Sequence, residues 1–242
     1  MNVPRTPHRW RVSPREAVRI QATLAGRVCL SPAPAVRRVL GLDCAFAGDR
    51  AVAVGVVWDM ETQQVLEVRG ATAQLTFPYV PGLLSFRETP VLLRVLRKVR
   101  HDVDVLMCDG QGVAHPRRFG LASHLGVIAD MPCVGAAKSL LVGEHAAVPA
   151  HRGAAVPLLH RGERVGTVVR TRSNVKPMYA SPGHHVDYCQ AADLTMHTAT
   201  AYRIPEPTRL ADRWVGMLKR GEVTLRGLNT LRNDRGPRRR RR

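Results

Sequence analysis

Long apolar runs, paired cysteines and acidic residues are all scarce in this chain of 242 residues. No apolar run approaches the ~18 residues that a helix needs to span a bilayer. The first residues, MNVPRTPHRW, offer no apolar stretch for a signal peptide. The five cysteines show neither zinc-ligand spacing nor an even disulfide framework, which favours a reducing compartment. We therefore expect a cytoplasmic protein without a membrane partner.

The shortage of acids leaves a strong positive charge. Lys and Arg number 37 against 19 Asp and Glu, which gives a formal net charge of +18 at pH 7. Nearly all of the basic residues are arginines, whose planar guanidinium forms bidentate contacts with phosphate. A charge of this size indicates a polyanionic partner, most simply nucleic acid. A compositional bias toward Arg and Ala is the alternative explanation.

The order of the expected elements indicates an α/β fold. A helix begins after the cap residue Ser13, and three strands then fill residues 37–75, where short turns favour an antiparallel meander. Strands and helices alternate between residues 85 and 137, which implies parallel pairing. Strand and loop follow to about residue 180, then a helix from near Asp187 and a short helix after a proline turn.

We expect one catalytic domain over residues 1–232, built as a mixed β-sheet flanked by helices. The arginine run at the end of the sequence has no apolar face and its charges repel one another, so residues 233–242 are expected to form a disordered tail.

Acidic residues interrupt or end two of the apolar strands. Asp43 lies within VLGLDCAF, where a lone carboxylate is costly to bury without a partner. Asp109 closes DVLMCDG, although Asp-Gly is also a common turn pair. If these strands pair in parallel, the two carboxylates meet, and a divalent cation would relieve their repulsion. Oxygen ligands suit Mg²⁺, for which Mn²⁺ can substitute.

Further polar candidates surround these acids. Glu88 has capping-box spacing to Ser85, and a helix cap is an equal alternative to metal binding. His115 could polarise a phosphate or protonate a leaving group, although a loop histidine is more often an ordinary surface residue. Lys138 follows an apolar strand, where lysine favours a nearby anion or carboxylate cluster.

Six motifs in this sequence resemble those of the endonuclease V family, the deoxyinosine 3′ endonucleases. They occur in the expected order between residues 41 and 212, as GLDCAF, PYVPGLLSFRE, CDGQGVAHPRRFGLASHLG, VGAAKSLLVG, GHHVD and YRIPEPTRLAD. The second and third motifs are long and specific. The resemblance implies an RNase H-like fold and metal-dependent cleavage at the second phosphodiester bond 3′ to hypoxanthine, leaving a 3′-hydroxyl, as a step of DNA repair.

The resemblance also implies roles for single residues. By motif position the metal carboxylates are Asp43, Glu88 and Asp109, while His115 and Lys138 match the catalytic histidine and lysine. The segment PYVP matches the family's strand-separating wedge, so its tyrosine would stack into the gap left by an everted base. The predicted substrate contacts are Tyr79, Pro78, Pro81, Gly82, Leu84, Gly110, Gly112, Arg117 and Arg118. Gln111 departs from the histidine or asparagine that the family often has there, which could alter the pocket.

Two other interpretations stay open. The natural substrate could be inosine-containing RNA rather than deoxyinosine-containing DNA, a choice that contacts to the 2′-hydroxyl would decide. A non-catalytic nucleic-acid-binding protein on the same scaffold would account for the charge, but the presence of all three acids disfavours it. We expect a monomer in either case.

Overall fold

Three long strands joined by tight turns form one half of the sheet. In the computed structural model, which describes residues 1–231, β1 (Arg38–Ala47), β2 (Arg50–Asp59) and β3 (Gln64–Gln74) pair antiparallel in the predicted meander. The β1–β2 turn contains Gly48, whose φ of +57° suits glycine. Each of the three strands has a buried central stretch, which is longest in β2, because helices cover the strands on both faces.

Two short strands continue the sheet in parallel with β1. β4 (Val105–Cys108) pairs with β1, and β5 (Cys133–Ala137) pairs with β4. The crossovers are α2 (Ser85–Leu96) and α3 (Leu121–Ala129). Every residue of β4 and β5 is buried, as expected for central parallel strands. This arrangement brings the carboxyl ends of β1, β4 and β5 to one edge, which is where ligands bind in open α/β sheets.

The other half of the sheet is antiparallel. β6 (Ala155–His160), β7 (Glu163–Val169) and β8 (Met178–His184) complete the order β3-β2-β1-β4-β5-β8-β7-β6. The strand β8 was not expected, because Pro182 and Gly183 lie within it and proline cannot donate to a β-ladder. Its pairing with β7 spans only Met178–Ala180, so the proline lies past the end of that ladder and its missing N–H costs no hydrogen bond there.

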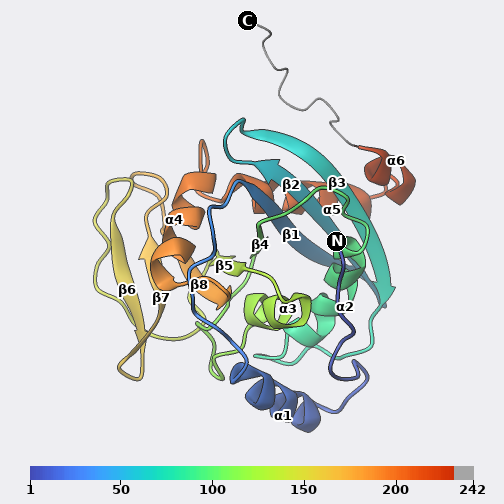
Figure 1. Ribbon diagram of the computed structural model, residues 1–242, viewed down its shortest axis with the longest axis horizontal. Helices are drawn as coiled ribbons and strands as arrows, with labels where there is room; N and C mark the ends of the chain where they lie inside the picture. The colour runs from blue at the N-terminus through green and yellow to red at the C-terminus, as the bar shows by residue number, and fades with distance from the viewer. Residues whose placement is uncertain (232–242) are drawn as a thin grey trace, which may run out of the picture.

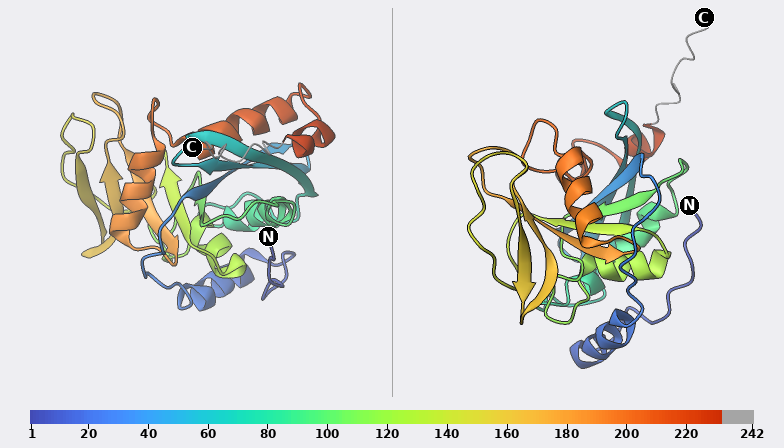
Figure 2. Two further views of the ribbon diagram at one scale, coloured as in Figure 1. Left: turned by 45° about the horizontal axis from the view of Figure 1, so that its top comes forward. Right: turned by 60° about the vertical axis from the view of Figure 1, so that its left-hand side comes forward.

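Helices cover both faces of the sheet (Figure 1). α1 (Pro14–Ala25), α2 and α3 lie on one face, while α4 (Tyr188–Thr198), α5 (Glu206–Lys219) and α6 (Leu225–Thr230) lie on the other, as Figure 2 shows. The α/β prediction is confirmed. α5 is longer than the short helix expected there, and α6 was not predicted.

A close contact between α5 and β1 matters for the site. A Cβ on Gly41 would lie 2.1 Å from the carbonyl carbon of Pro207, so only glycine lets the start of α5 approach β1 this closely. Within residues 1–231, no helix combines the length and the apolar character that a membrane span requires. The expected tail at residues 233–242 lies outside the described residues.

Candidate functional site

Three predicted carboxylates lie at the carboxyl edge of the parallel strands. Leu42 pairs with Cys108, so Asp43 and Asp109 follow in register on neighbouring strands, and the predicted parallel pairing is confirmed. Glu88 comes from the first turn of α2. The charges of Asp43 and Asp109 act on the pKa of Glu88, so the three groups form one electrostatic unit.

The helix-cap explanation of Glu88 is wrong. Leu84 occupies the N-cap position of α2 and makes no side-chain cap hydrogen bond. Ser85 instead places its hydroxyl 2.9 Å from Nδ1 of His124. By contrast, Ser13 caps α1 as predicted and accepts a hydrogen bond from the backbone N–H of Glu16 at 3.2 Å. The Glu88 carboxylate is therefore left to interact with the other acids.

Removal from water perturbs two of these carboxyls strongly. Desolvation, followed by the charges of Asp43 and Asp109, raises the pKa of Glu88 to about 8. Desolvation, followed by the charges of Asp109 and Asp212, raises the pKa of Asp43 to about 7. Carboxyls in such surroundings retain protons near neutral pH unless a cation compensates their charge. The cluster therefore has the electrostatics of a cation site.

Lys138 supplies one positive charge to this cluster. Its Nζ lies 2.5 Å from Oδ2 of Asp109. Burial opposes the charged form of Lys138, but the hydrogen bond and charge of Asp109 outweigh it, and the pKa of Lys138 is raised. Within residues 1–231 this is the only ion pair to Asp43, Glu88 or Asp109, although the charge of Arg87 also acts on Glu88.

Asp212 is a fourth acid that sequence reasoning did not single out. Its charge raises the pKa values of both Asp43 and Lys138, which places it beside the cluster. It comes from α5, and the close approach of that helix to Gly41 brings it to β1. Asp43 lies two residues after Gly41 and so shares its face of the strand. The only sequence signal was the acid that ends YRIPEPTRLAD.

A cleft of about 410 Å³ opens beside Asp109 and Lys138. Its volume lies in the ~300–1,000 Å³ range of small-molecule pockets. The wall contains the predicted contacts Tyr79, Pro81, Gly82, Leu84 and Gly110, whereas Pro78, Gly112, Arg117 and Arg118 lie outside it. The predicted catalytic residue His115 is also in the wall.

The rim of the cleft is apolar and exposed to solvent. Tyr79 is 70% exposed, and Leu84, Leu140 and Leu141 are also exposed. Large apolar side chains gathered in water at a cleft indicate a binding surface. Sequence reasoning missed the two adjacent leucines, although their place in a loop directly after Lys138, rather than in a strand, was a usable signal.

Hydrogen bonds to a single backbone carbonyl hold the loop that carries Tyr79. The carbonyl oxygen of Gly82 accepts hydrogen bonds from Gln21 Nε2 at 3.1 Å and Arg117 Nη2 at 2.6 Å. Nε2 of His115 lies 3.0 Å from the same oxygen. Gly82 itself has a φ of +75°, which glycine adopts without strain. Donors from α1 and from the 115–117 turn thus hold the Tyr79 loop in place.

His115 uses both ring nitrogens within the protein. Its Nδ1 accepts a hydrogen bond from the backbone N–H of Arg117 at 3.2 Å, so the proton of the neutral ring is on Nε2, facing Gly82. Burial, and then the charge of Arg117, lower the pKa of His115 to about 4. The ring is therefore neutral at pH 7, and in this arrangement it orients the Tyr79 loop; its catalytic role stays a prediction.

Arg118 and Gly112 also have partners inside the protein. Arg118 forms an ion pair with Glu163 at 2.9 Å and contacts His160. A Cβ on Gly112 would lie 2.0 Å from the carbonyl oxygen of Pro182, so this glycine allows β8 to approach. Both residues position the loop after Asp109, and direct contact with substrate stays a prediction for each.

Gln111 joins the loop after Asp109 to the loop that carries Lys138. Its Nε2 donates to the carbonyl oxygen of Ser139 at 3.0 Å, and its Oε1 accepts from the Ser181 hydroxyl at 3.4 Å. The same hydroxyl accepts the backbone N–H of Gly112 at 2.7 Å. Gln111, which departs from the family's usual residue, therefore links three segments of the site.

A model of the Endonuclease V family matches residues 22–213. The chain belongs to the Endonuclease V family. An Endonuclease V from Methanothrix thermoacetophila is 47% identical over 220 residues, which cover 91% of this chain and 97% of the relative. A crystal structure of Endonuclease V from Streptomyces avermitilis is 42% identical with a TM-score of 0.84, and the match covers 92% of this chain and all of that one.

A third match bears on ligands. The Ciona intestinalis Endonuclease V, solved in complex with a 24mer DNA containing an inosine followed by a ribo-adenosine, is 25% identical with a TM-score of 0.76, and the match covers 86% of this chain and 98% of that one. Family membership confirms the resemblance seen in the sequence. This chain is an endonuclease that acts on phosphodiester bonds.

Proposed function

We propose that this endonuclease recognises hypoxanthine in nucleic acid and hydrolyses the second phosphodiester bond 3′ to it, leaving a 3′-hydroxyl. The observation that carries the proposal is the junction of two features: a desolvated carboxylate cluster and an adjoining cleft whose rim presents an exposed tyrosine. The inosine-containing DNA held by the Ciona protein supports the same substrate class. The role of such a reaction is repair of deaminated adenine.

The residues at this edge fit a divalent metal ion. Family membership supports a divalent-metal requirement. We propose Mg²⁺, with Mn²⁺ as a substitute, held by Asp43, Glu88 and Asp109. Three acids with one lysine leave an excess of negative charge in a desolvated place, and carboxylate oxygens suit hard cations. The bound ion would activate water and stabilise the leaving oxygen.

The remaining side chains would orient the substrate. The cleft beside Asp109 would receive the flipped base, whose extrusion costs a few kcal/mol and is least costly at a mismatched base. Tyr79 would stack against the neighbouring bases in the gap. Lys138 would hold the Asp109 carboxylate and neutralise part of the charge that develops on the phosphate. The position of the Tyr79 loop beside the cleft would be kept by His115, Gln21 and Arg117.

The test is cleavage of end-labelled strands that carry one inosine. Matched substrates would be DNA, RNA, and DNA with a ribonucleotide directly 3′ to inosine, each incubated with Mg²⁺ or with EDTA. A single product cut at the second bond, only with Mg²⁺, supports the proposal. Faster cleavage of the RNA would identify an endoribonuclease as the alternative function, and absence of cleavage in all three would contradict both.

We expect Tyr79→Ala to weaken binding to duplex inosine DNA more than binding to the same single strand, because stacking of the ring supports strand separation. Base–aromatic stacking contributes ~1–3 kcal/mol, so the duplex affinity should fall by about five-fold to about 150-fold. Fluorescence anisotropy on both substrates measures this difference. Tyr79→Phe keeps the ring and serves as the control; equal losses on the two substrates would assign Tyr79 another role.

We expect deletion of residues 236–242 to affect affinity but not specificity. Each phosphate neutralised on duplex DNA contributes ~0.9 to the slope of log affinity against log salt. Removal of five arginines should flatten that slope and weaken undamaged and inosine DNA by similar factors. The measurement is binding to both DNAs across a salt series. A selective loss for inosine DNA, or a shifted cut, would mean that this segment takes part in recognition.

A further inference from the structure

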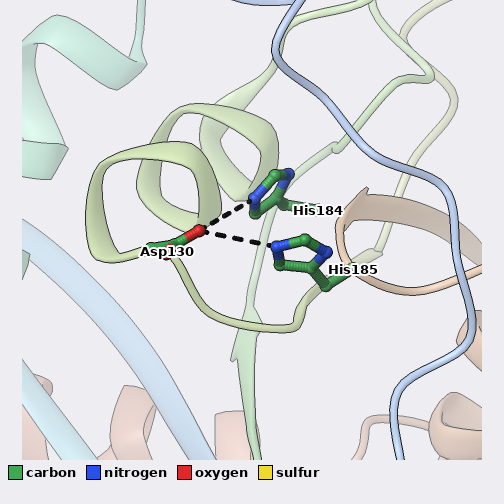
Figure 3. A group of neighbouring side chains, drawn as sticks. All are labelled: Asp130, His184 and His185. Carbon is green, nitrogen blue, oxygen red and sulfur yellow. Dashed lines mark ion pairs between the residues drawn. The ribbon is translucent and has the colours of Figure 1, made fainter.

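A second group of potential metal ligands lies at the opposite end of the central strands, near the start of β5. Asp130 follows α3, His184 ends β8, and His185 comes next. Figure 3 shows the two imidazoles directed at one carboxylate oxygen. Because His184 pairs with Cys133 at the start of β5, the group is remote from Lys138, which follows the end of that strand. We propose that these three residues bind a divalent transition ion of the zinc class, independently of the proposed nuclease centre.

The spacing of the ligand atoms fits such an ion. Nε2 of His184 lies 3.6 Å from Oδ1 of Asp130, and Nε2 of His185 lies 3.5 Å from the same oxygen. One ligand atom from each residue lies within 4.8 Å of the other two. Ligands bound at ~2.0–2.1 Å in a tetrahedral site are separated by about 3.3–3.4 Å. Both contacts are too long for ordinary hydrogen bonds but close to the separation that a shared ion would impose.

The ligand types select the class of ion. Imidazole suits zinc and its neighbours in the transition series, whereas Mg²⁺ prefers carboxylates and water. Two imidazoles with one carboxylate therefore differ in kind from the all-carboxylate cluster at the carboxyl edge. The Asp130 side chain is 77% exposed and that of His185 is 37% exposed, so water can reach the ion and complete its coordination. The chain would thus hold two chemically distinct cations.

The backbone already fixes two ligands close to the required positions. A Cβ on Gly126 would lie 2.7 Å from the Cβ of His184, so α3 packs directly on the end of β8. The backbone N–H of His185 donates to the carbonyl oxygen of Cys29 at 2.7 Å. Ligands mounted on packed elements lose little freedom when an ion binds. The Asp130 side chain is largely exposed and has room to adjust its rotamer to an ion.

Binding requires a proton to move within His184. Its Nδ1 accepts the backbone N–H of Cys29 at 3.2 Å, so the neutral ring carries its proton on Nε2. An ion at Nε2 needs that lone pair, so the neutral ring must take its proton on Nδ1 and give up the bond from Cys29. His185 has no such conflict, because its Nε2 already faces Asp130 and no hydrogen bond to its Nδ1 is found among residues 1–231. Loading the site therefore releases the Cys29 amide from β8.

The first experiment measures stoichiometry. Metal-free full-length protein is titrated with Zn²⁺ in excess Mg²⁺, which competes for the carboxylate cluster but not for imidazole. We expect one Zn²⁺ per chain, and at least about ten-fold weaker binding in Asp130→Asn and in His185→Asn, by the scale of disrupted metal sites. These residues are exposed or half-buried, so both variants should fold, which their retained Mg²⁺-dependent cleavage would verify.

Two control variants distinguish this site from other zinc ligands. His197 is exposed on α4, and His197→Asn should leave the titration unchanged. Cys29 is an exposed thiol near the group, and Cys29→Ser should also bind Zn²⁺ normally. Equal binding by wild type, Asp130→Asn and His185→Asn would overturn the proposal, and so would a loss confined to Cys29→Ser.

The tautomer of His184 provides an independent readout. Long-range ¹H–¹⁵N spectra of the histidine rings should show the Nε2–H form without zinc and the Nδ1–H form with zinc. Exchange of the Cys29 amide with solvent should accelerate on loading. Zn²⁺ that leaves the His184 and His185 signals unmoved would contradict the assignment. Because these signals do not depend on nuclease activity, failure here is separable from failure of the proposed function.

Discussion

Asp109→Ala is expected to reduce strand cleavage to a trace, with a rate about a hundred-fold to a thousand-fold below wild type, which is the scale of removing a group that stabilises developing charge. Asp109 follows the central strand β4 and is the carboxylate that contacts Lys138 at 2.5 Å. Its loss removes a proposed metal ligand and leaves Lys138 without its partner. Single-turnover cleavage of an inosine-containing strand with Mg²⁺ measures the effect.

Binding should survive this change. Asp109 contributes one side chain to the cleft wall, but the rest of the wall and the exposed tyrosine belong to other residues, so lesion binding in Ca²⁺ or metal-free buffer is expected to stay measurable. Asp102→Ala is the matched control, because the Asp102 side chain is 98% exposed and lies outside the cluster; this variant should cleave normally. Full activity of Asp109→Ala would show that the metal assignment is wrong.

The metal-free protein is expected to lose stability as the pH rises from about 6.5 to about 9. Folded-state pKa values of about 7 for Asp43 and about 8 for Glu88 lie above the ordinary values of 3.8 for Asp and 4.5 for Glu. The native state therefore keeps protons that the unfolded chain has released, and stability falls with pH until both groups ionise. At about 1.4 kcal/mol per pKa unit, the loss should reach a few kcal/mol.

Above pH 6.5 the change in stability reports on these acids and not on the buried histidines. Burial lowers the pKa values of His115 and His124 below the ordinary value of 6.5 for histidine, so their contribution to stability changes only at lower pH. Urea unfolding in EDTA across this window measures the slope. Glu88→Gln should flatten it and stabilise the metal-free protein at high pH, and Mg²⁺ should restore wild type. A flat wild-type profile would contradict the burial of the charged cluster.

The parts of the fold that follow from local pattern were predictable from the sequence. The meander, the parallel strands and the helix capped by Ser13 each have a signal in hydrophobic periodicity or in a cap residue. For β8 the sequence argued against a strand, because Pro182 cannot donate a ladder hydrogen bond. In the structure Pro182 pairs with Val134 of β5 and lies past the end of the β7 ladder. The place of β8 between β5 and β7 is a long-range pairing that no local pattern encodes.

The site shows the same division. Asp43 and Asp109 were predictable because acids at the ends of apolar strands need partners, and the register of those strands followed from the topology. Asp212 was not, because its place depends on how closely α5 approaches Gly41. The connections of Gln111 and Gln21 depend on contacts between segments 28 and 61 residues apart. Their amide side chains carry no sequence signal of those partners.

The hydrogen bonds that hold the Tyr79 loop at the Gly82 carbonyl have a consequence for how undamaged DNA is searched. A loop that ordered only on contact with DNA would lose conformational entropy at every position sampled, which would slow the survey of long stretches of normal sequence. Here Gln21, His115 and Arg117 hold the loop before any DNA arrives. Under the role proposed for Tyr79, each encounter would test only whether the base pair beneath it opens easily, and the mechanics of the duplex itself would select weakly paired hypoxanthine.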